Sequence, residues 1–159
     1  MRTLVVALVL LGSLAIPAVT HAQRPVLQID GIPQQIDVQS WSWGVTQTGS
    51  ARAGAGGGAG RAEFEPLTVT KRVDASSPQL FVDTASGKHF PGASLTVRAA
   101  DGGTLRYILS DVMISGLTVD DSTGESVSLT YGKIELEHRA PGQATPVTAG
   151  WDVRPNRRL

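Results

Sequence analysis

Cysteine is absent from the 159 residues of this chain, and histidine is scarce, with three in total. The absence of cysteine excludes disulfide bonds and metal sites built from thiolates. His89 and His138 do not stand in a spacing that is typical of a metal site, so we expect neither a metal nor another cofactor. A small domain without these supports must be stabilised by a buried apolar core or by assembly with copies of itself.

An excess of charge of one sign is also missing. The sequence holds 14 basic and 14 acidic residues, and its formal net charge is zero. Nucleic acids and anionic membrane surfaces bind basic faces of proteins. We therefore expect no nucleic-acid partner and no attraction to a membrane surface.

Long apolar runs are missing except at the N-terminus. Arg2 precedes the apolar stretch Leu4–Ile16, and small residues follow it up to Ala22. This pattern is typical of a secretory signal peptide and predicts residues 1–22 as that peptide, with cleavage after Ala22. A membrane anchor is the less favoured alternative, because the run is too short for a hydrocarbon core of roughly 30 Å. We expect export to the periplasm or beyond, without stable membrane insertion.

The remaining residues, 23–159, are enough for one domain with one core. Apolar and polar residues alternate with period two along most of this part, and the alternation slips by one residue at Gln39 or Ser40, which indicates a β-bulge. Turn residues separate the alternating segments, so the pattern predicts a mainly β antiparallel barrel or sandwich. The predicted strands are 26–32, 35–45, 62–73, 93–100, 104–119, 125–140 and 145–154.

One short helix is predicted at residues 78–86. Ser77 is the expected N-cap, because its hydroxyl can accept a backbone N–H that lacks a helical partner. Pro78 suits the first helical position, and Gly87 can adopt the left-handed conformation that ends a helix. Leu80, Phe81 and Ala85 cluster on about one face of this helix.

Aromatic residues make up only 5 % of the sequence, yet Trp41 and Trp43 stand one residue apart. On a regular strand, side chains two residues apart share a face. Plain core packing explains such a pair. An alternative is that one ring packs in the core while the other supports a contact with another subunit. We expect Trp41, Trp43 and Trp151 to be structural anchors.

The stretch from Gly49 to Gly60 is almost pure glycine and alanine and lies between two predicted strands, so it is an extended internal loop. Phosphate binding is disfavoured, because the segment after the loop is a strand rather than a helix and the Gly-Lys-Ser/Thr motif is missing. A long loop within a compact domain is usually functional or disordered.

Catalytic and calcium-binding patterns are weak in this sequence. The first candidate is Asp83, Ser86 and His89, which more simply belong to the end of the helix. The second is an acidic group around a predicted turn, which lacks the alternating ligands of a calcium loop: Asp111, Asp120, Asp121 and Glu125. Since no polar constellation converges, we expect no enzyme activity.

Four motifs together resemble the haemolysin-coregulated protein (Hcp) family, the tube-forming component of bacterial type VI secretion systems. They are "SWSWG" before the glycine-rich loop, "LTVTKRVDASSPQL", "SGKHFPGASLTVR" and "GWDVRPN". The resemblance extends from about Leu27 to Asn156. It implies a two-sheet antiparallel β-barrel with one short helix, a six-membered ring with a wide channel, and rings stacked into a tube that carries small effector proteins.

The resemblance also implies roles for particular residues. The extended loop helps to join neighbouring subunits or rings, and a glycine backbone can lie closely on another chain. Ser115 is a candidate for the channel lining. The expected subunit contacts are Gly49, Arg52, Gly54, Gly56, Gly57, Gly58 and Gly60.

One feature departs from the family. Its members normally lack a cleavable signal, because the secretion apparatus loads them from the cytoplasm, whereas this chain begins with the signal pattern of residues 1–22. A second hypothesis is therefore a stand-alone exported binding module that has the same barrel but does not form the tube.

Overall fold

The computed structural model of the chain describes residues 24–47, 60–122 and 124–159. The predicted signal peptide, residues 1–22, lies outside the described residues. Most of the predicted loop contacts also lie outside them: Gly49, Arg52, Gly54, Gly56, Gly57 and Gly58.

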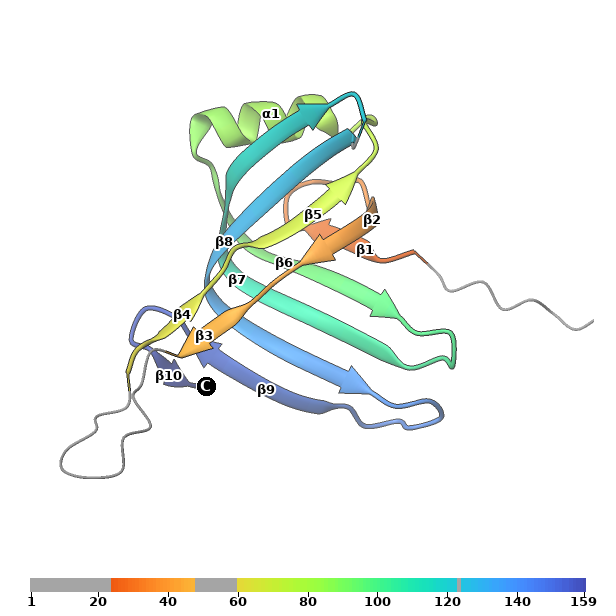
Figure 1. Ribbon diagram of the computed structural model, residues 1–159, viewed down its shortest axis with the longest axis vertical. Coiled ribbons are helices and arrows are strands. Elements are labelled where there is room, and N and C mark those ends of the chain that lie inside the picture. The colour runs from red at the N-terminus through yellow and green to blue at the C-terminus, as the bar shows by residue number, and fades with distance from the viewer. Residues whose placement is uncertain (1–23, 48–59, 123) are drawn as a thin grey trace, which may run out of the picture.

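The described part of the chain is mainly β, with one helix (Figure 1). This confirms the predicted fold class. The elements are β1 (Val26–Ile29), β2 (Ile36–Ser42), β3 (Val45–Gln47), β4 (Ala62–Phe64), β5 (Leu67–Lys71), α1 (Ser77–Ser86), β6 (His89–Arg98), β7 (Thr104–Asp120), β8 (Gly124–Arg139), β9 (Val147–Asp152) and β10 (Arg157–Arg158).

Six strands close into an antiparallel barrel in the order β8, β5, β2, β1, β6 and β7, because β7 pairs back onto β8. The two longest strands, β7 and β8, form the hairpin that makes this closure. The first half of β8 pairs with β5, and its second half, from Lys133, pairs with β9. The sheet therefore continues past the barrel as β9 and β10, and β8 belongs to both parts.

A separate two-stranded sheet, β3 and β4, extends from the barrel near β9 (Figure 1). Val45 pairs with Phe64 at the base of this hairpin, and Gln47 pairs with Ala62 at its far end. Before it, the register of β2 against β5 shifts between Val38 and Ser40, which confirms the predicted bulge.

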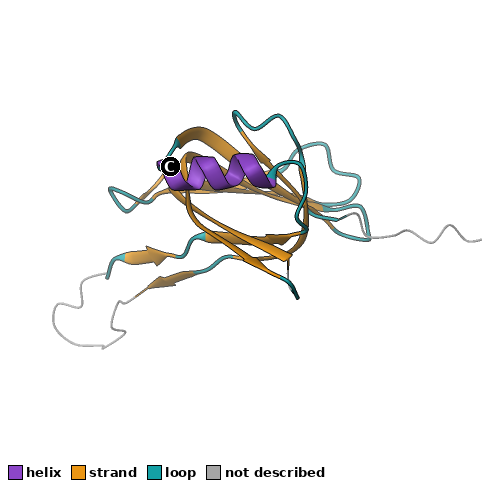
Figure 2. Ribbon diagram, turned by 90° about the horizontal axis from the view of Figure 1, so that it is seen from above, coloured by secondary structure: helices purple, strands orange, loops and turns teal. Residues whose placement is uncertain are grey.

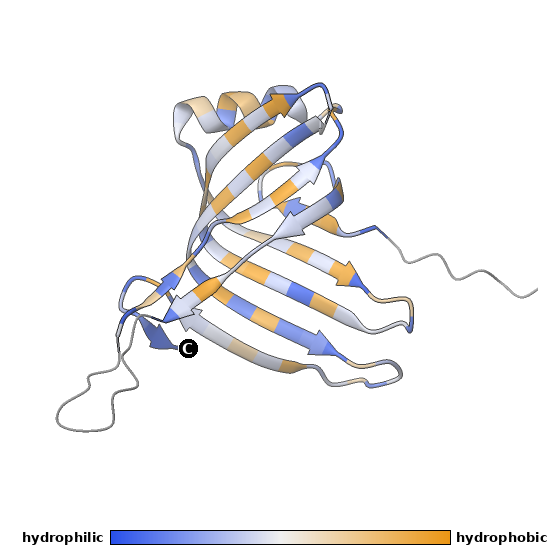
Figure 3. Cartoon of the chain, viewed as in Figure 1, coloured by the Kyte–Doolittle hydropathy of each residue, from blue (hydrophilic) through white to orange (hydrophobic). Residues whose placement is uncertain are grey.

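The core follows from the period-two pattern, because alternate side chains of a strand point to opposite faces. Figure 3 shows the resulting stripes of apolar and polar residues along the strands. Inward positions are apolar on almost every strand of the barrel. The largest fully buried apolar side chains are Leu27, Ile29, Ile36, Leu67, Leu80, Phe90, Leu95, Leu109, Leu129 and Ile134.

The helix differs from the prediction at its start and on its outer face. Ser76, not Ser77, occupies the N-cap position, and Ser77 is the first helical residue. The Ser77 hydroxyl does not cap the helix, because it bonds to charged groups described below. Gly87 ends the helix in the left-handed conformation expected for it, at φ 64°.

Figure 2 looks down on α1, which lies over the barrel at one end of the molecule. Leu80 and Asp83 are its buried residues. Leu80 is buried whereas Phe81 is 64 % exposed, so the cluster predicted for Leu80, Phe81 and Ala85 does not form one buried face. Successive helical residues are about 100° apart, and only one of Leu80 and Phe81 can face the barrel. No helix in the described part of the chain has the length and apolar character needed to cross a membrane.

Candidate functional site

Trp41, on β2, and Trp43, just after β2, pack on the same residue of β7. The ring centroids of Trp41 and Trp43 lie 5.0 Å and 5.7 Å from that of Tyr107. Both indoles therefore pack on the same buried tyrosine, although β2 ends at Ser42 and only Trp41 lies within the strand. All three tryptophans are half-buried and pack against the core, with Trp151 on β9.

The ring of Phe64, on β4, lies near both Trp43, which precedes β3, and Trp151 on β9. Its ring centroid lies 6.4 Å from that of Trp43 and 6.3 Å from that of Trp151. Tilted aromatic pairs at such distances contribute about 0.5–1.5 kcal/mol beyond their buried area. The hairpin formed by β3 and β4 is thus held against β8 and β9 by aromatic rings.

Two hydrogen bonds fix the orientation of this hairpin. The indole Nε1 of Trp43 donates to the Tyr131 hydroxyl at 2.5 Å, and that hydroxyl donates to the backbone oxygen of Glu65 at 2.9 Å. Burial raises the pKa of Tyr131 above its ordinary value of 10.0. The bond from Trp43 acts in the opposite direction, and the nearby Glu65 carboxylate raises the pKa further. The phenol therefore stays protonated and able to donate near neutral pH.

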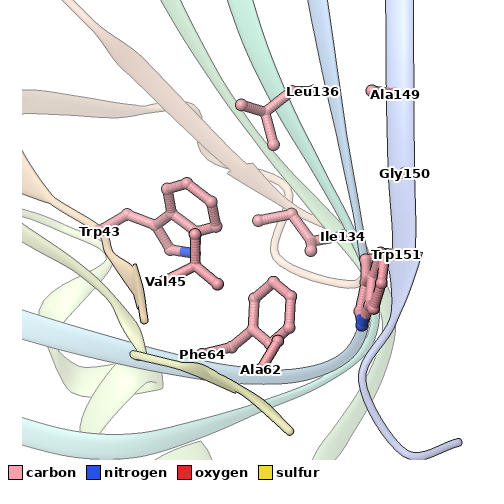
Figure 4. A pocket seen from close by; sticks show the side chains of 9 residues that line it. All are labelled: Trp43, Val45, Ala62, Phe64, Ile134, Leu136, Ala149, Gly150 and Trp151. Atoms are coloured by element: carbon pink, nitrogen blue, oxygen red, sulfur yellow. The ribbon is translucent and has the colours of Figure 1, made fainter. Parts of the chain in front are cut away.

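Between the hairpin and the inner face of β8 and β9 lies an open apolar pocket of about 280 Å³ (Figure 4). Aromatic rings from β4, from β9 and from the link between β2 and β3 face it, and aliphatic side chains complete its wall. Its lining residues are Trp43, Val45, Ala62, Phe64, Ile134, Leu136, Ala149, Gly150 and Trp151. None of these side chains is a nucleophile, an acid or a base. The pocket can hold an apolar side chain, and it offers no group for catalysis.

A second cluster joins β5, β8 and the start of α1 through charge. Lys71 and Glu125 are directly opposite on neighbouring strands, both are buried, and Lys71 Nζ lies 2.5 Å from Glu125 Oε2. The Ser77 hydroxyl accepts from Lys71 at 3.1 Å and donates to Glu125 at 2.6 Å. The Asp74 carboxylate lies 3.0 Å from Lys71 Nζ. Each of the two buried charges therefore has an opposite charge and a hydroxyl.

Sequence reasoning missed this cluster, although a signal was present. The alternation Leu67, Val69 and Lys71 places a lysine at an inward position of β5. A lysine at such a position requires a buried partner. The partner, Glu125, occupies the matching inward position before Val127 on β8.

In the structure, the residues of the weak catalytic and calcium-binding candidates contact different partners and form no common site. Asp83 accepts a hydrogen bond from Gln79 and lies 3.3 Å from Lys88 Nζ, whereas His89 faces Asp111 at 3.5 Å. Asp83 and His89 are therefore engaged with different partners.

The acidic group is likewise split. Glu125 pairs with Lys71, Asp111 pairs with Arg154, and Asp120 bonds to Ser122. Among the described residues, no group of three or more possible ligands could hold a metal ion.

Ser115, the predicted channel-lining residue, and Gly60, a predicted subunit contact, are the remaining candidates. Ser115 is exposed on β7, where the register against β8 shifts between Ile114 and Gly116, and its hydroxyl donates to the Ser128 backbone oxygen at 3.2 Å. Gly60 is half-buried just before β4. Their roles in a channel and in a subunit contact stay predictions.

The chain is thus a mainly β protein whose closed six-stranded barrel carries one flanking helix and a small second sheet. The family model described as "Type VI secretion system effector, Hcp" matches residues 27–138. Protein hcp1 of Pseudomonas aeruginosa is 39 % identical over 137 residues, which cover 77 % of this chain and 85 % of that protein. The chain belongs to the Hcp family, whose members are structural tube components of type VI secretion systems.

Solved structures agree with this assignment. Hcp1 from Salmonella typhimurium is 29 % identical with a TM-score of 0.69, and the match covers 87 % of this chain and all of that one, 100 %. Another solved type VI secretion system protein superposes with a TM-score of 0.74 at 20 % identity, again over 87 % of this chain and 100 % of that one. The second likeness supports the barrel fold alone.

Proposed function

We propose that copies of this chain assemble into a ring, with six copies as the expected number, and that rings stack into a secretion tube. Membership in the Hcp family supports this role. The observation that carries the proposal is the open apolar pocket beside the hairpin. A pocket walled by Trp43, Phe64 and Trp151 is exposed in the single chain, and apolar surface of this kind is typical of subunit contacts.

Open strand edges support the same proposal. Within the described residues, the outer edge of β9 is paired by β10 only at Trp151 and Asp152. Val147, at the start of β9, is 73 % exposed. Unpaired edges and exposed apolar residues are normally covered in a stable protein, and contact with an identical neighbour would cover them.

The glycine-rich segment is the second element of the proposal. It connects β3 to β4, the two strands that wall the pocket. We propose that Gly54, Gly56 and the neighbouring glycines lie on an adjacent subunit, where larger side chains would not fit. Ordering such a segment costs about 1–2 kcal/mol per residue, so contacts with a partner must offset that free energy.

A deletion tests the role of the segment. Removal of residues 53–59 should lower the fraction of assembled protein in sedimentation velocity, while the circular dichroism spectrum of the barrel stays unchanged. Replacement of the same residues by a Gly-Ser linker of equal length is the matched control for loop closure. An assembly state unaffected by the deletion would refute this role.

The channel of the proposed ring would carry small effector proteins, with Ser115 as a candidate lining residue. A Ser115→Gln variant should reduce capture of an effector by assembled rings without changing the rings themselves. Equal capture by the variant and by the original chain would exclude Ser115 from the lining.

Residues 1–22 favour a second candidate function, a stand-alone exported binding module. The apolar run Leu4–Ile16 and Ala22 form a signal-peptide pattern, and a tube loaded from the cytoplasm has no use for export. Fusion of residues 1–22 to a reporter that is active only after export separates the two functions. An active reporter supports export of this chain, and an inactive reporter retained in the cytoplasm supports the ordinary tube role.

A further inference from the structure

A polar pocket of about 180 Å³ lies on the outer face of the barrel, across the paired strands β1 and β6 (Figure 1). Leu27 and Leu95 point inward and are buried, so the residues that alternate with them face outward. No acidic side chain is among those that line the pocket, and its walls therefore carry positive charge. The polar residues that line it are Arg24, Gln28, Gln35, Ser94, Thr96 and Arg98.

The strand register brings the two arginines of this pocket together. Val26 pairs with Thr96 in the antiparallel pair of β1 and β6. Continued by two residues, the same register places Arg24, just before β1, opposite Arg98 at the end of β6. Like charges directly opposite on neighbouring strands destabilise a sheet. An anion held between the two guanidinium groups would turn this repulsion into attraction.

The charge of the arginines is not neutralised within the described residues. No ion pair or side-chain hydrogen bond in this part of the chain involves Arg24 or Arg98. Asp37 stands opposite Val26 on β2, but it does not line the pocket and forms no ion pair with either arginine. The two guanidinium groups are therefore available to an outside anion.

The rest of the pocket supplies neutral hydrogen-bond donors. The hydroxyls of Ser94 and Thr96 and the carboxamides of Gln28 and Gln35 line it. In the described part of the chain, none of these four side chains has a hydrogen-bond partner. Hydroxyls and carboxamides can donate to the oxygen atoms of a ligand, and each guanidinium offers five N–H donors. The lining thus suits a ligand that is rich in oxygen and negatively charged.

We propose that this pocket binds the phosphate group of a small molecule, with Arg24 and Arg98 on either side of it. A phosphate monoester carries a charge of about −1.5 to −2 at neutral pH, which two arginines balance, whereas a carboxylate carries only one charge. The guanidinium fork also binds two phosphate oxygens at once. The ligand is small, because the pocket is below the roughly 300–1,000 Å³ that is typical of sites for drug-sized ligands.

This site is separate from the features that support self-assembly. The apolar pocket is built from β3, β4, β8, β9 and the link before β3, whereas the phosphate pocket belongs to β1 and β6. It is also distinct from the glycine-rich loop, in which the sequence offers no phosphate-binding motif. The inference therefore stands or fails independently of the ring and the tube.

Titration calorimetry with inorganic phosphate tests the site in the full chain, in a buffer that contains about 0.15 M chloride to screen weak surface attraction. We expect saturable binding of a single phosphate per chain. Arg24→Gln and Arg98→Gln should each weaken it at least tenfold, because each removes a charge-assisted contact. Arg157→Gln, which removes an exposed arginine from β10 with the same change of charge, is the control and should weaken it less than twofold. Absence of saturable binding, or an equal loss in the control, would overturn the proposal.

The unfolding midpoint gives a second measurement with a change of sign. Without phosphate, Arg98→Gln should be at least as stable as the original chain, because it removes the repulsion with Arg24. With saturating phosphate, the original chain should gain stability through binding, and the variant should not. Since Arg98 is exposed, the substitution should not prevent folding. An equal gain by the variant and the original chain would contradict a site at this arginine.

Three probes identify the source of the phosphate group. Tighter binding of glucose 6-phosphate than of inorganic phosphate supports a sugar phosphate, and Gln28→Ala should then remove the difference. Equal affinity for these two probes supports free phosphate as the ligand. Glucose, which has no charge, should not bind. Binding of glucose as tight as that of glucose 6-phosphate would overturn the assignment of an anion site.

Discussion

Lys71 and Glu125 form an ion pair in which both side chains are buried, at 0 % and 1 % exposure, with 2.5 Å between Nζ and Oε2. The pair bridges β5 and β8, two strands of the closed barrel. Ser77 bonds to both partners and thereby connects α1 to the same point. The helix is thus attached to the barrel by charge as well as by the apolar contact of Leu80.

Breaking this pair from one side should destabilise the domain strongly. Glu125→Gln leaves the Lys71 ammonium buried without a full counter-charge, and we expect the free energy of unfolding to fall by about 3–5 kcal/mol. The control is Lys133→Met, which removes an exposed lysine whose Nζ lies 4.0 Å from Asp152 Oδ2. This variant should change the free energy of unfolding by less than about 1 kcal/mol. Urea unfolding measures both, and equal effects would contradict the account.

Replacing both partners should be less harmful than replacing one. In Lys71→Met/Glu125→Leu no buried charge remains, and an apolar pair of similar volume can be neutral. We expect the double variant to be more stable in urea than Glu125→Gln. A double variant less stable than Glu125→Gln would indicate that the ion pair itself is required.

Asp74 predicts a pH dependence at acid pH. Burial raises its pKa, but hydrogen bonds from Ser76 and the bond and charge of Lys71 outweigh burial, so that the pKa lies below its ordinary value of 3.8. A lowered folded pKa adds stability above the unfolded value, and this is lost as pH falls through the folded pKa. Between pH 5 and 2, Asp74→Asn should therefore show a shallower decline of the urea midpoint than the original chain. A decline as steep as that of the original chain would contradict this role of Asp74.

The Tyr131 hydroxyl should matter more than the Tyr107 hydroxyl, although both rings pack near Trp43. Tyr131→Phe leaves the Trp43 N–H without its acceptor and the Glu65 carbonyl without its donor, at an expected loss of about 1–3 kcal/mol. Tyr107→Phe keeps the ring contacts with Trp41 and Trp43 and should cost less than about 1 kcal/mol. Thermal unfolding compares the two variants. A larger loss for Tyr107→Phe than for Tyr131→Phe would contradict the role of the Tyr131 hydroxyl in fixing the hairpin.

Two glycines with positive φ should respond differently to alanine. Gly87, at φ +64°, has open space around an added Cβ, so Gly87→Ala should cost roughly 1 kcal/mol for the left-handed conformation alone. Gly124, at φ +83°, would place its Cβ 2.6 Å from the Lys71 backbone oxygen, and Gly124→Ala should cost roughly 2–4 kcal/mol. Similar unfolding midpoints for the two variants would show that the β7–β8 turn relaxes freely.

Much of the fold could be predicted from local sequence because the barrel strands alternate with period two. The slip near Ser40 predicted the observed bulge, and Gly87 ends the helix as expected. The start of β6 was missed: Pro91 and Gly92 read as a turn, whereas the strand runs through them from His89. On β7, Asp111 stands between Ser110 and Val112, the partners of Gly92 and Phe90, and takes positive φ.

The candidate site was less predictable because its parts are distant in sequence. The pocket joins residues of β3 and β4 to residues of β8 and β9, and only tertiary pairing brings Phe64 close to Trp151. The tryptophans could be predicted as structural anchors from the sequence, but the pocket beside them could not. The role of Ser77 was also hidden, since its hydroxyl responds to the distant Glu125 rather than to its own helix.

The mass of the native assembly tests the central claim most directly. Residues 23–159 should be purified and measured by native mass spectrometry across a wide range of concentration. The account predicts a particle of six copies or a stack of such particles, which persists on dilution to low micromolar concentration. A mass equal to one chain at the highest concentration would contradict self-assembly through the pocket and the hairpin.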